Sequence, residues 1–381
     1  MLPFERLATQ VLRIVATILT LTTCFLDVPA QTMTVDDYDP VSGLVVPEHR
    51  ILTARYPFVD VHGHQRNPTA GRVDTLVTEM DALNMATMVN LSGGSGQRLV
   101  STVEAMNKRY PGRFVVFANV DFSNFAEEGF GDRAAAKLEQ DVENGARGLK
   151  IFKNLGMFLR DVDGSIVQPD DPRLDPIWAK CAELGIPVLI HVGEPAPFYQ
   201  PHDRYNERWY ELKERPERKR PPEEFGTWEE TMAGQHRLFR RHPKTIFINA
   251  HLGWMGNDLA RLGRLLDELP NVYTEIGAVL AELGRQPRFA HDWLIKYQDR
   301  VMFGKDAWGP EEYRVYFRTL ETADDYIKYY RKRHAHWRIY GLDLPDEVLR
   351  KLYYQNALNV IPGLDAALFS QVEEGRRGVD D

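Results

Sequence analysis

The chain has 381 residues, of which 43% are hydrophobic, and this is enough to bury a large core in a single large domain. The formal net charge of -8 is spread along the sequence and not gathered in blocks, which argues against a nucleic-acid-binding surface. Charge therefore bears on solubility here and not on the choice of partner.

The first thirty or so residues have the pattern of a secretory signal peptide. Basic residues precede the apolar run IVATILTLTTCFL, and the small residues VPA at 28–30 follow it. The run is short for a membrane span. We therefore predict cleavage after Ala30 and a secreted or periplasmic protein without a membrane attachment. An uncleaved anchor and lipidation at Cys24 are the alternatives. The mature chain would keep only Cys181, so it could form no intrachain disulfide.

Short apolar runs recur along the rest of the chain, with helix-like segments between them. Eight such runs occupy residues 58–64, 86–93, 113–120, 146–152, 187–193, 245–253, 271–277 and 301–308. The segments 73–84 and 259–270 carry apolar residues three and four positions apart, as amphipathic helices do. Near-continuous apolar strands that alternate with helices indicate a buried parallel sheet.

Eight strand and helix units predict an α/β fold, a (β/α)₈ TIM barrel over residues 58–363. A polar lead-in, residues 31–57, precedes the barrel, and residues 364–381 are predicted to be a flexible tail. The segment 345–363 predicts a closing helix. A doubly wound open sheet is the structural alternative, but the Gly-rich SGGSG at 92–96 does not fit the GxGxxG turn that such a sheet would need.

Two insertions interrupt the regular spacing. Residues 196–232 follow the fifth strand, and residues 309–345 follow the eighth. Both leave from the carboxyl ends of strands, the face on which barrel enzymes build their active sites. We interpret them as a wall or lid over that face, with a solvated surface decoration as the alternative.

The stretch FVDVHGHQ, residues 58–65, ends the first strand with polar residues on one face. Asp60, His62 and His64 share that face because strand side chains alternate. A half-exposed edge strand would explain them without any function. A divalent metal site would use both imidazoles as ligands, and Asp60 would then orient a ligand or hold the turn.

Further donors follow other strands. His191 ends the fifth strand, His251 the sixth and Asp306 the eighth. In a barrel these strand ends converge on one central mouth, so the side chains become neighbours. Imidazole nitrogen and carboxylate oxygen are good ligands for Zn²⁺. The set therefore predicts a site for a divalent ion, with Zn²⁺ as the expected metal.

These motifs resemble those of a known family. The HxH of the first strand, LIHVGEP, INAHLGW, MFGKDAWGP and the closing YYQNALNVIPG are similar to the amidohydrolase superfamily, in particular its amidohydrolase-related branch, which includes relatives of aminocarboxymuconate-semialdehyde decarboxylase. The resemblance spans roughly residues 58–363. It implies one metal ion held by His62, His64, His191 and Asp306, and His251 as the general acid or base.

A second metal is the open question within this resemblance. Family members with two metals bridge them through a carboxylated lysine at the end of the fourth strand. Lys150 and Lys153 both lie near that position, and neither matches it securely. Lys150 could instead pair with a neighbouring carboxylate, and Lys153 could bind an anionic substrate.

Three functions compete. In a hydrolase of small esters, lactones or amides, Asp306 would accept a proton from metal-activated water and His251 would polarise the carbonyl or shuttle the proton. In a non-oxidative decarboxylase, a lyase that the resemblance allows, the same ligands would hold the substrate's acid. A secretory pattern favours hydrolysis. A non-catalytic metal-binding protein is disfavoured because His251 is present.

The substrate is predicted to be a small, anionic molecule, and homo-oligomer formation is left open. Residues near the strand ends or in the first insertion are candidates to bind it. They are Lys153, Glu194, Arg204, Arg208, Trp254 and Trp308. Arginine suits a carboxylate, and tryptophan can form an apolar wall. For each of them, packing or solvation is the alternative. His334 and His336 form a second HxH but lie in a helix-like basic segment, where they are not expected to bind metal.

Overall fold

The computed structural model describes residues 33–369. The chain divides into two compact units, one up to Val46 and one from Pro47. In the described part of the first unit, the chain makes a turn in which Thr34 Oγ1 donates to Asp37 Oδ2 at 2.6 Å. The predicted signal peptide and Cys24 lie outside the described residues. Within residues 33–369, no helix combines the length and the hydropathy that a membrane span requires.

The strands of the second unit are parallel and follow one another in chain order. Within the described residues they form a sheet of three strands and a sheet of six. The strands are β1 (Phe58–Gly63), β2 (Met85–Asn90), β3 (Phe114–Val116), β4 (Ala118–Asn119), β5 (Leu149–Ile151), β6 (Val188–Ile190), β7 (Phe247–Asn249), β8 (Val272–Glu275) and β9 (Val301–Met302). The predicted third strand is thus divided into β3 and β4, and every other predicted strand overlaps one observed strand.

Hydrogen bonds join the two sheets at both edges. On one side Phe117 N donates to Asn90 O at 3.0 Å, and Ala118 N donates to Gly148 O at 2.8 Å, so one chain segment changes partner at Phe117. On the other side Val61 N donates to Phe303 O at 3.0 Å, and Asp306 N to His62 O at 2.8 Å. The sheets therefore continue around a (β/α)₈ TIM barrel, as the sequence predicts.

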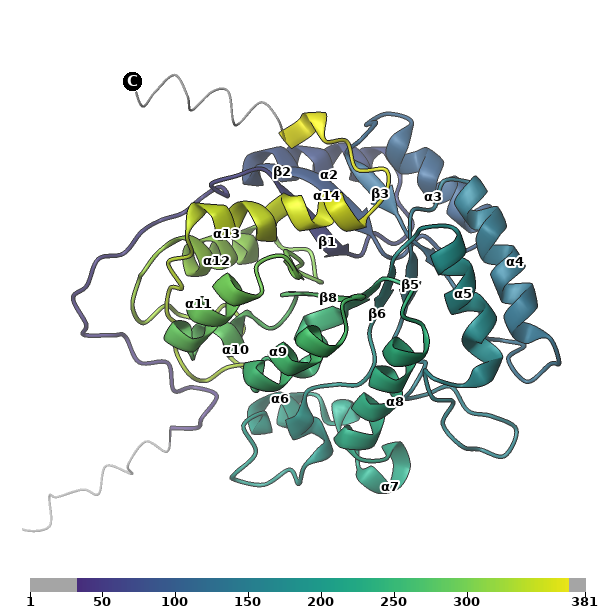
Figure 1. Cartoon of the computed structure of the whole chain (residues 1–381). Helices are drawn as coiled ribbons and strands as arrows, with labels where there is room; N and C mark the ends of the chain where they lie inside the picture. The colour runs from purple at the N-terminus through teal and green to yellow at the C-terminus, as the bar shows by residue number, and fades with distance from the viewer. Residues whose placement is uncertain (1–32, 370–381) are drawn as a thin grey trace, which may run out of the picture. The chain divides into compact units, whose positions relative to one another are not determined.

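Helices surround the strands (Figure 1). They are α2 (Ala70–Leu83), α3 (Gln97–Asn107), α4 (Phe130–Glu143), α5 (Asp175–Glu183), α6 (Trp209–Glu214), α7 (Pro222–Phe225), α8 (Trp228–Arg241), α9 (Leu259–Glu268), α10 (Leu280–Gly284), α11 (Pro287–Lys296), α12 (Pro310–Glu321), α13 (Asp346–Arg350) and α14 (Asn356–Val360). Shorter 3₁₀ turns are η1 (Pro172–Leu174), η2 (Ala196–Tyr199), η3 (Pro216–Arg218) and η4 (Ala250–Trp254), and η5 (Lys351–Gln355) is a π-helical turn.

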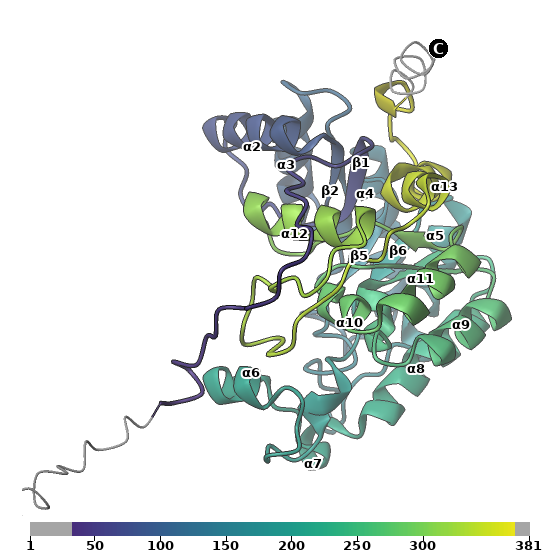
Figure 2. The ribbon, with the colours of Figure 1, turned by 90° about the vertical axis from the view of Figure 1, so that its left-hand side faces the viewer.

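The closing helix and the first insertion occupy different regions of the barrel unit. The predicted closing helix is α13, η5 and α14 in succession, with Pro345 immediately before it. The insertion after β6 contains η2, α6, η3 and α7, and its last residues already belong to α8. Figure 2 shows α6 and α7 at the lower edge of the barrel unit, well away from α13.

One further insertion has no counterpart in the prediction. Residues 152–174, between β5 and α5, contain an antiparallel bridge between Arg160 and Ile166. Its sequence is polar and rich in turn residues, so it carries no periodic signal. At the other end of the barrel the packed chain reaches Phe369, whose ring stacks on Tyr354 with centroids 5.1 Å apart. Phe369, which belongs to the predicted tail 364–381, is therefore packed against the barrel unit.

Candidate metal centre and active site

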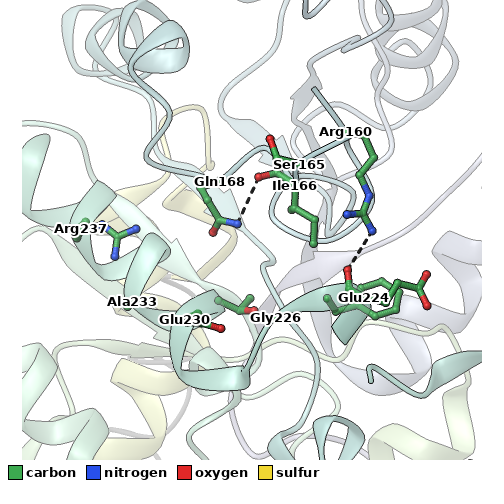
Figure 3. A pocket seen from close by; sticks show the side chains of 11 residues that line it. Arg160, Ser165, Ile166, Gln168, Glu224, Gly226, Glu230, Ala233 and Arg237 are labelled. Carbon is green, nitrogen blue, oxygen red and sulfur yellow. Dashed lines mark hydrogen bonds between the residues drawn. The ribbon is translucent and has the colours of Figure 1, made fainter. Parts of the chain in front are cut away.

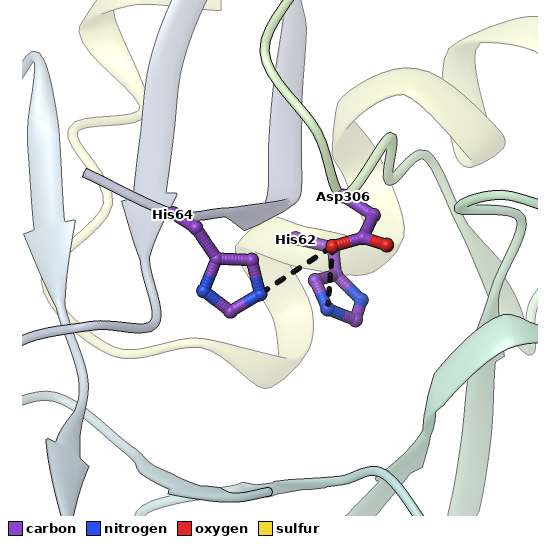
Figure 4. A group of neighbouring side chains, drawn as sticks. All are labelled: His62, His64 and Asp306. Atoms are coloured by element: carbon purple, nitrogen blue, oxygen red, sulfur yellow. Dashed lines mark ion pairs between the residues drawn. The ribbon is translucent and has the colours of Figure 1, made fainter. Parts of the chain in front are cut away.

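His62, His64 and Asp306 meet at the carboxyl ends of β1 and β9. The Nε2 atoms of His64 and His62 lie 3.6 Å and 4.0 Å from the same Asp306 oxygen, Oδ1. Figure 4 shows both imidazoles turned toward that carboxylate. One donor atom from each residue lies within 4.8 Å of the other two, a spacing that one ion could bridge. The polar face of FVDVHGHQ thus points into the barrel and not to solvent.

Backbone contacts bring this cluster together. Asp306 N donates to His62 O, and Asp306 itself has a left-handed backbone with φ 79°. Asp60 Oδ1 accepts the backbone N–H groups of His62 at 2.9 Å and of Lys305 at 3.1 Å. Tyr313 donates its hydroxyl to the other Asp60 oxygen at 2.6 Å. Asp60 therefore ties the backbone before His62 to the backbone before Asp306.

The outer nitrogens of both imidazoles are already occupied. His62 Nδ1 lies 2.9 Å from Glu275 Oε1, and His64 Nδ1 lies 3.0 Å from Ser92 Oγ. A carboxylate can only accept, so Nδ1 of His62 carries the proton and its Nε2 presents a lone pair to the site. This is the orientation that a metal-binding histidine takes.

His191 and His251 form the neighbouring part of the site. Their rings are 4.5 Å apart, with His251 Nε2 at 3.3 Å from His191 Nδ1. His251 Nδ1 donates to the Gly277 carbonyl at 2.8 Å, so when the ring is neutral its Nε2 accepts from His191. The remaining His191 nitrogen, Nε2, is buried and has no hydrogen-bond partner among the described residues.

A strained turn holds His251 in place. His251, Leu252, Gly253 and Trp254 all have positive φ, between 53° and 60°. For residues other than glycine this conformation costs roughly 1–2 kcal/mol each. Trp254 anchors the turn by donating Nε1–H to the Gly193 carbonyl at 3.0 Å. Such strain concentrates at functional sites, and here it aims His251 back across the mouth of the barrel.

Burial sets the charge state of the cluster. It lowers the pKa of His62 and of His191 well below the ordinary range, and it lowers the pKa of His64 to about 4, with Lys150 adding to the effect in each case. Burial acts to raise the pKa of Asp306, but the nearby imidazoles and Lys150 outweigh it and bring that pKa to about 2. Near neutral pH the site therefore offers neutral imidazoles and an ionised carboxylate.

This donor set fits a divalent ion. Free imidazole lone pairs, an ionised carboxylate and the unpartnered Nε2 of His191 are the ligands that Zn²⁺ and similar ions take. His62, His64 and Asp306 are already grouped, whereas His191 sits beside His251. The residues predicted to bind one metal ion thus converge on a single region.

A cavity of about 280 Å³ opens in front of these residues. Asp306, His191 and His251 lie at its inner end, and the insertions after β6 and β9 supply its walls. Four of the predicted substrate residues line it: Lys153, Glu194, Arg208 and Trp254. Further lining residues, which the sequence did not single out, are Glu211, Arg215, Glu217, Arg218, Arg331 and Arg333, and His334 of the second HxH also lines the cavity.

Two predicted substrate residues lie elsewhere. Arg204 is exposed and contacts its neighbour Tyr205. Trp308 donates Nε1–H to Glu79 at 2.8 Å and packs on Tyr313 at 5.3 Å between ring centroids. Neither lines the cavity, because a position in the insertion or next to a strand end does not decide which way a side chain turns.

The basic residues of the cavity wall are paired to different extents. The buried Glu194 carboxylate contacts Lys153, Arg218 and Arg220. Burial acts to raise the pKa of Glu194, but these cations outweigh it and lower that pKa. The nearest acidic partners of Arg333 and Arg215 lie 3.7 Å and 4.0 Å away, beyond good hydrogen-bond distance. The wall can therefore attract an anion.

The two lysines near the fourth predicted strand have different surroundings. Lys153 is paired with Glu194. Lys150 is fully buried, and its Nζ has no hydrogen-bond partner among the described residues, so it does not pair with a carboxylate. Burial lowers the pKa of Lys150 to about 7. Of the two, Lys150 is the one whose amine is not already engaged.

The second HxH lies in the wall and not in the donor cluster. His334 contacts Glu211 at 3.3 Å. His336 packs beside Trp337. Neither residue belongs to a group of metal donors among the described residues.

A larger cavity, of about 510 Å³, lies outside the barrel mouth between residues 160–168, α7 and α8 (Figure 3). It contains no predicted site residue. Its polar groups are engaged with the protein: Arg160 donates to the Glu224 carbonyl at 3.2 Å, and Arg237 pairs with Asp170 at 2.6 Å. Volume alone therefore does not identify the functional site, because two of the predicted metal donors and the predicted general acid or base line the smaller cavity.

A parallel barrel with imidazoles and a carboxylate at the carboxyl ends of its strands is the arrangement of a metal-dependent barrel enzyme. The family model described as Amidohydrolase (Amidohydro_2) matches residues 59–362, and the chain belongs to that family. This confirms the family that the sequence motifs resemble.

Several solved structures share the fold. One is a 2,6-dihydroxybenzoate decarboxylase complexed with 2,6-dihydroxybenzoate, with 16% identity, a TM-score of 0.51, and coverage of 80% of this chain and 99% of the other. A dihydroxybenzoic acid decarboxylase from a Polaromonas species, with bound manganese and the inhibitor 2-nitroresorcinol, has 16% identity, a TM-score of 0.49, and coverage of 83% and 99%. An uncharacterized TIM-barrel protein from Bordetella bronchiseptica has 16% identity, a TM-score of 0.48, and coverage of 80% and 98%. No curated protein matches the chain.

Sequence reasoning missed Glu275, although the residue carries a recognisable signal. It is the last residue of β8, at the same end of the barrel as the histidines, and it is fully buried. A lone glutamate that ends an apolar strand with no cation nearby in the sequence could have been identified as a partner for a strand-end histidine.

Proposed function

We propose that the chain is a metal-dependent hydrolase that acts on a small, anionic ester, lactone or amide. The observation that carries the proposal is Asp306, an ionised carboxylate with a half-exposed side chain next to two neutral imidazoles at the inner end of the cavity. An ionised carboxylate in this position can take a proton from an attacking water molecule.

His62, His64, His191 and Asp306 would hold one divalent ion, with Zn²⁺ as the proposed metal. Such an ion, when bound, polarises a substrate oxygen and activates water at neutral pH. The chain's own contribution is to keep three imidazoles neutral and their lone pairs directed inward, through burial and through the partners of their outer nitrogens.

His251 is the proposed proton carrier for the leaving group. Its Nδ1 is occupied by the Gly277 carbonyl, so Nε2 is the atom that accepts and returns the proton. Its neighbour at that atom is His191 Nδ1, which donates to Nε2 and orients the ring while His251 is neutral. Imidazole suits this role because its ordinary pKa lies close to neutral pH.

The cavity wall supports an anionic substrate. Lys153, Arg218 and the buried Arg220 contact the carboxylate of Glu194, and Arg218 also pairs with Glu211, so three cations meet two carboxylates in this part of the site. Arg215 and Arg333 add guanidinium groups without close acidic partners. Arginine binds carboxylates through two parallel hydrogen bonds, which orients them as well as attracting them.

Decarboxylation is the second candidate, and the same cation-rich wall favours it because a substrate carboxylate must be held there. The two reactions share ligands and differ in product. A screen of lactones, amides and aromatic or enoic acids, with and without a chelator, separates them. Chelation-sensitive hydrolysis supports the hydrolase, whereas chelation-sensitive release of carbon dioxide replaces it with the lyase. Turnover that survives complete metal removal would contradict both.

A further inference from the structure

The carboxylate of Glu275 lies between His62, a proposed metal ligand, and His251, the proposed proton carrier. Glu275 Oε1 is 2.9 Å from His62 Nδ1 and accepts the His251 backbone N–H at 2.6 Å. Its other oxygen, Oε2, accepts the backbone N–H of Gly277. The two rings that it joins stack with centroids 4.7 Å apart.

The surroundings of Glu275 leave space for this carboxylate, and the buried Lys150 interacts with it electrostatically without forming an ion pair. A Cβ atom on Gly277 would approach Oε2 to 2.6 Å, and one on Gly304 would come closer still. Among the described ion pairs, Glu275 takes part only in those with His62 and His251. A buried carboxylate without a lysine or arginine partner is costly unless its hydrogen bonds are strong, so its contact with the imidazole is not incidental.

We propose that Glu275 is a positioning residue that fixes the tautomer of His62 and the turn that carries His251. By accepting from Nδ1 of His62 it keeps the Nε2 lone pair facing Asp306, and it increases the basicity of that nitrogen. By accepting from the His251 amide it stabilises the first residue of the left-handed turn at 251–254. The inference rests on the proposed function, because it takes His62 to be a ligand.

The test is the affinity of the chelator-stripped protein for Zn²⁺, measured by competition with a chromogenic chelator and without any substrate. Glu275→Gln keeps the size of the side chain but replaces one accepting oxygen with an NH₂ group, which faces a donor. Loss of a carboxylate partner of a metal-binding histidine typically weakens metal binding about 10–100-fold, and we expect this range.

Glu321→Gln is the matched control. Glu321 is also a buried carboxylate, and it accepts the backbone N–H of Arg55 at 3.0 Å and the hydroxyl of Tyr353 at 2.7 Å, outside the metal site and the cavity. Its replacement should leave the Zn²⁺ affinity within about twofold of the wild type, even if the protein melts earlier. Equal loss of affinity in both variants would overturn the inference in favour of a general effect on stability.

A second readout concerns the ring itself. In metal-free protein with ¹⁵N-labelled histidine, His62 should be held in the Nδ1-protonated tautomer in the wild type, and its resonances should change in Glu275→Gln and not in Glu321→Gln. If Glu275→Gln does not fold, Glu275→Asp, which withdraws the carboxylate by one methylene, serves in its place. Unchanged Zn²⁺ affinity and unchanged histidine resonances would overturn the inference.

Failure of the proposed function gives a different result. If no hydrolysis is found but Glu275→Gln still weakens Zn²⁺ binding, the inference stands and the reaction assignment is wrong. If hydrolysis is found and both Zn²⁺ affinity and tautomer are unchanged in Glu275→Gln, the reaction assignment stands and the inference is wrong.

Discussion

The donor cluster and the cavity wall of this barrel are built in different ways. The donors His62, His64 and Asp306 lie at or just after strand ends, and His62 and its neighbours Glu275 and His251 are almost fully buried and take part in hydrogen bonds with the backbone. The wall comes from the insertions, and cations such as Arg215 and Arg333 are 53% and 38% exposed with only long ionic contacts. The strand ends of the barrel thus hold the proposed metal donors in place, and the more exposed insertions carry the groups that would bind a substrate.

The largest expected effect comes from breaking the donor cluster. His62→Ala with His64→Ala should abolish stoichiometric metal binding and reduce chelation-sensitive turnover to background, because two of the four proposed ligands are gone. Elemental analysis and the turnover assay measure this. His242→Ala is the control, since His242 pairs with Asp175 away from the site at 2.9 Å. A double variant that still copurifies with one Zn²⁺ per chain would contradict the assignment of His62 and His64 as metal ligands.

A smaller but still large effect should follow from His251→Ala. The donor cluster stays complete, so metal content should be unchanged, while kcat falls roughly 10²–10⁴-fold, the range typical of a lost general acid or base. Metal analysis and steady-state kinetics on the same preparation separate the two effects. Unchanged kcat would remove the proton-transfer role of His251.

The cavity wall should respond differently. Removing its two weakly paired guanidinium groups with Arg215→Ala and Arg333→Ala should raise KM for an anionic substrate by about tenfold or more, because each charged hydrogen bond is worth about 1.5–3 kcal/mol. Metal content should not change. Arg204→Ala, in the same insertion but outside the cavity, is the matched control. An equal KM change in the control would indicate a general charge effect.

The smallest effect concerns acid stability. The pKa of His64 is lowered to about 4 in the folded protein, while the unfolded chain has the ordinary value near 6.5, so the unfolded state binds more protons between these values. Metal-free protein should therefore lose stability as pH falls from 6.5 to 4, and His64→Gln, which does not titrate, should lose less. Urea unfolding at several pH values measures the difference. Parallel pH profiles for both proteins would contradict the buried, neutral state of His64.

The fold and the grouping of His62, His64 and Asp306 could be predicted because both rest on short-range patterns. Alternating and continuous apolar runs mark strands, and an imidazole at the end of such a run is unusual enough to notice. Other features depend on the direction of side chains in space. Arg204 and Trp308 lie near the expected positions but turn to Tyr205 and Glu79, and no local pattern encodes that choice.

Glu275 and the insertion at 152–174 show two further limits. Glu275 acts through residues more than twenty positions away, so its role emerges only when β8 lies beside β7 and His251 reaches its carboxylate. The insertion has polar turns and no period, and such a segment looks the same in sequence whether it is ordered or not. The side chains at the strand ends were thus easier to predict from the sequence than the insertions around them.

The most direct test of the account is the metal stoichiometry of unmutated protein that has been stripped with a chelator, reloaded with excess Zn²⁺ and freed of unbound ion. We predict one ion per chain, bound at the cluster that contains His62, His64 and Asp306. Two ions would bring the unpartnered Lys150 back as a bridging candidate. A folded protein that retains no metal would contradict the metal centre and the hydrolase proposal with it.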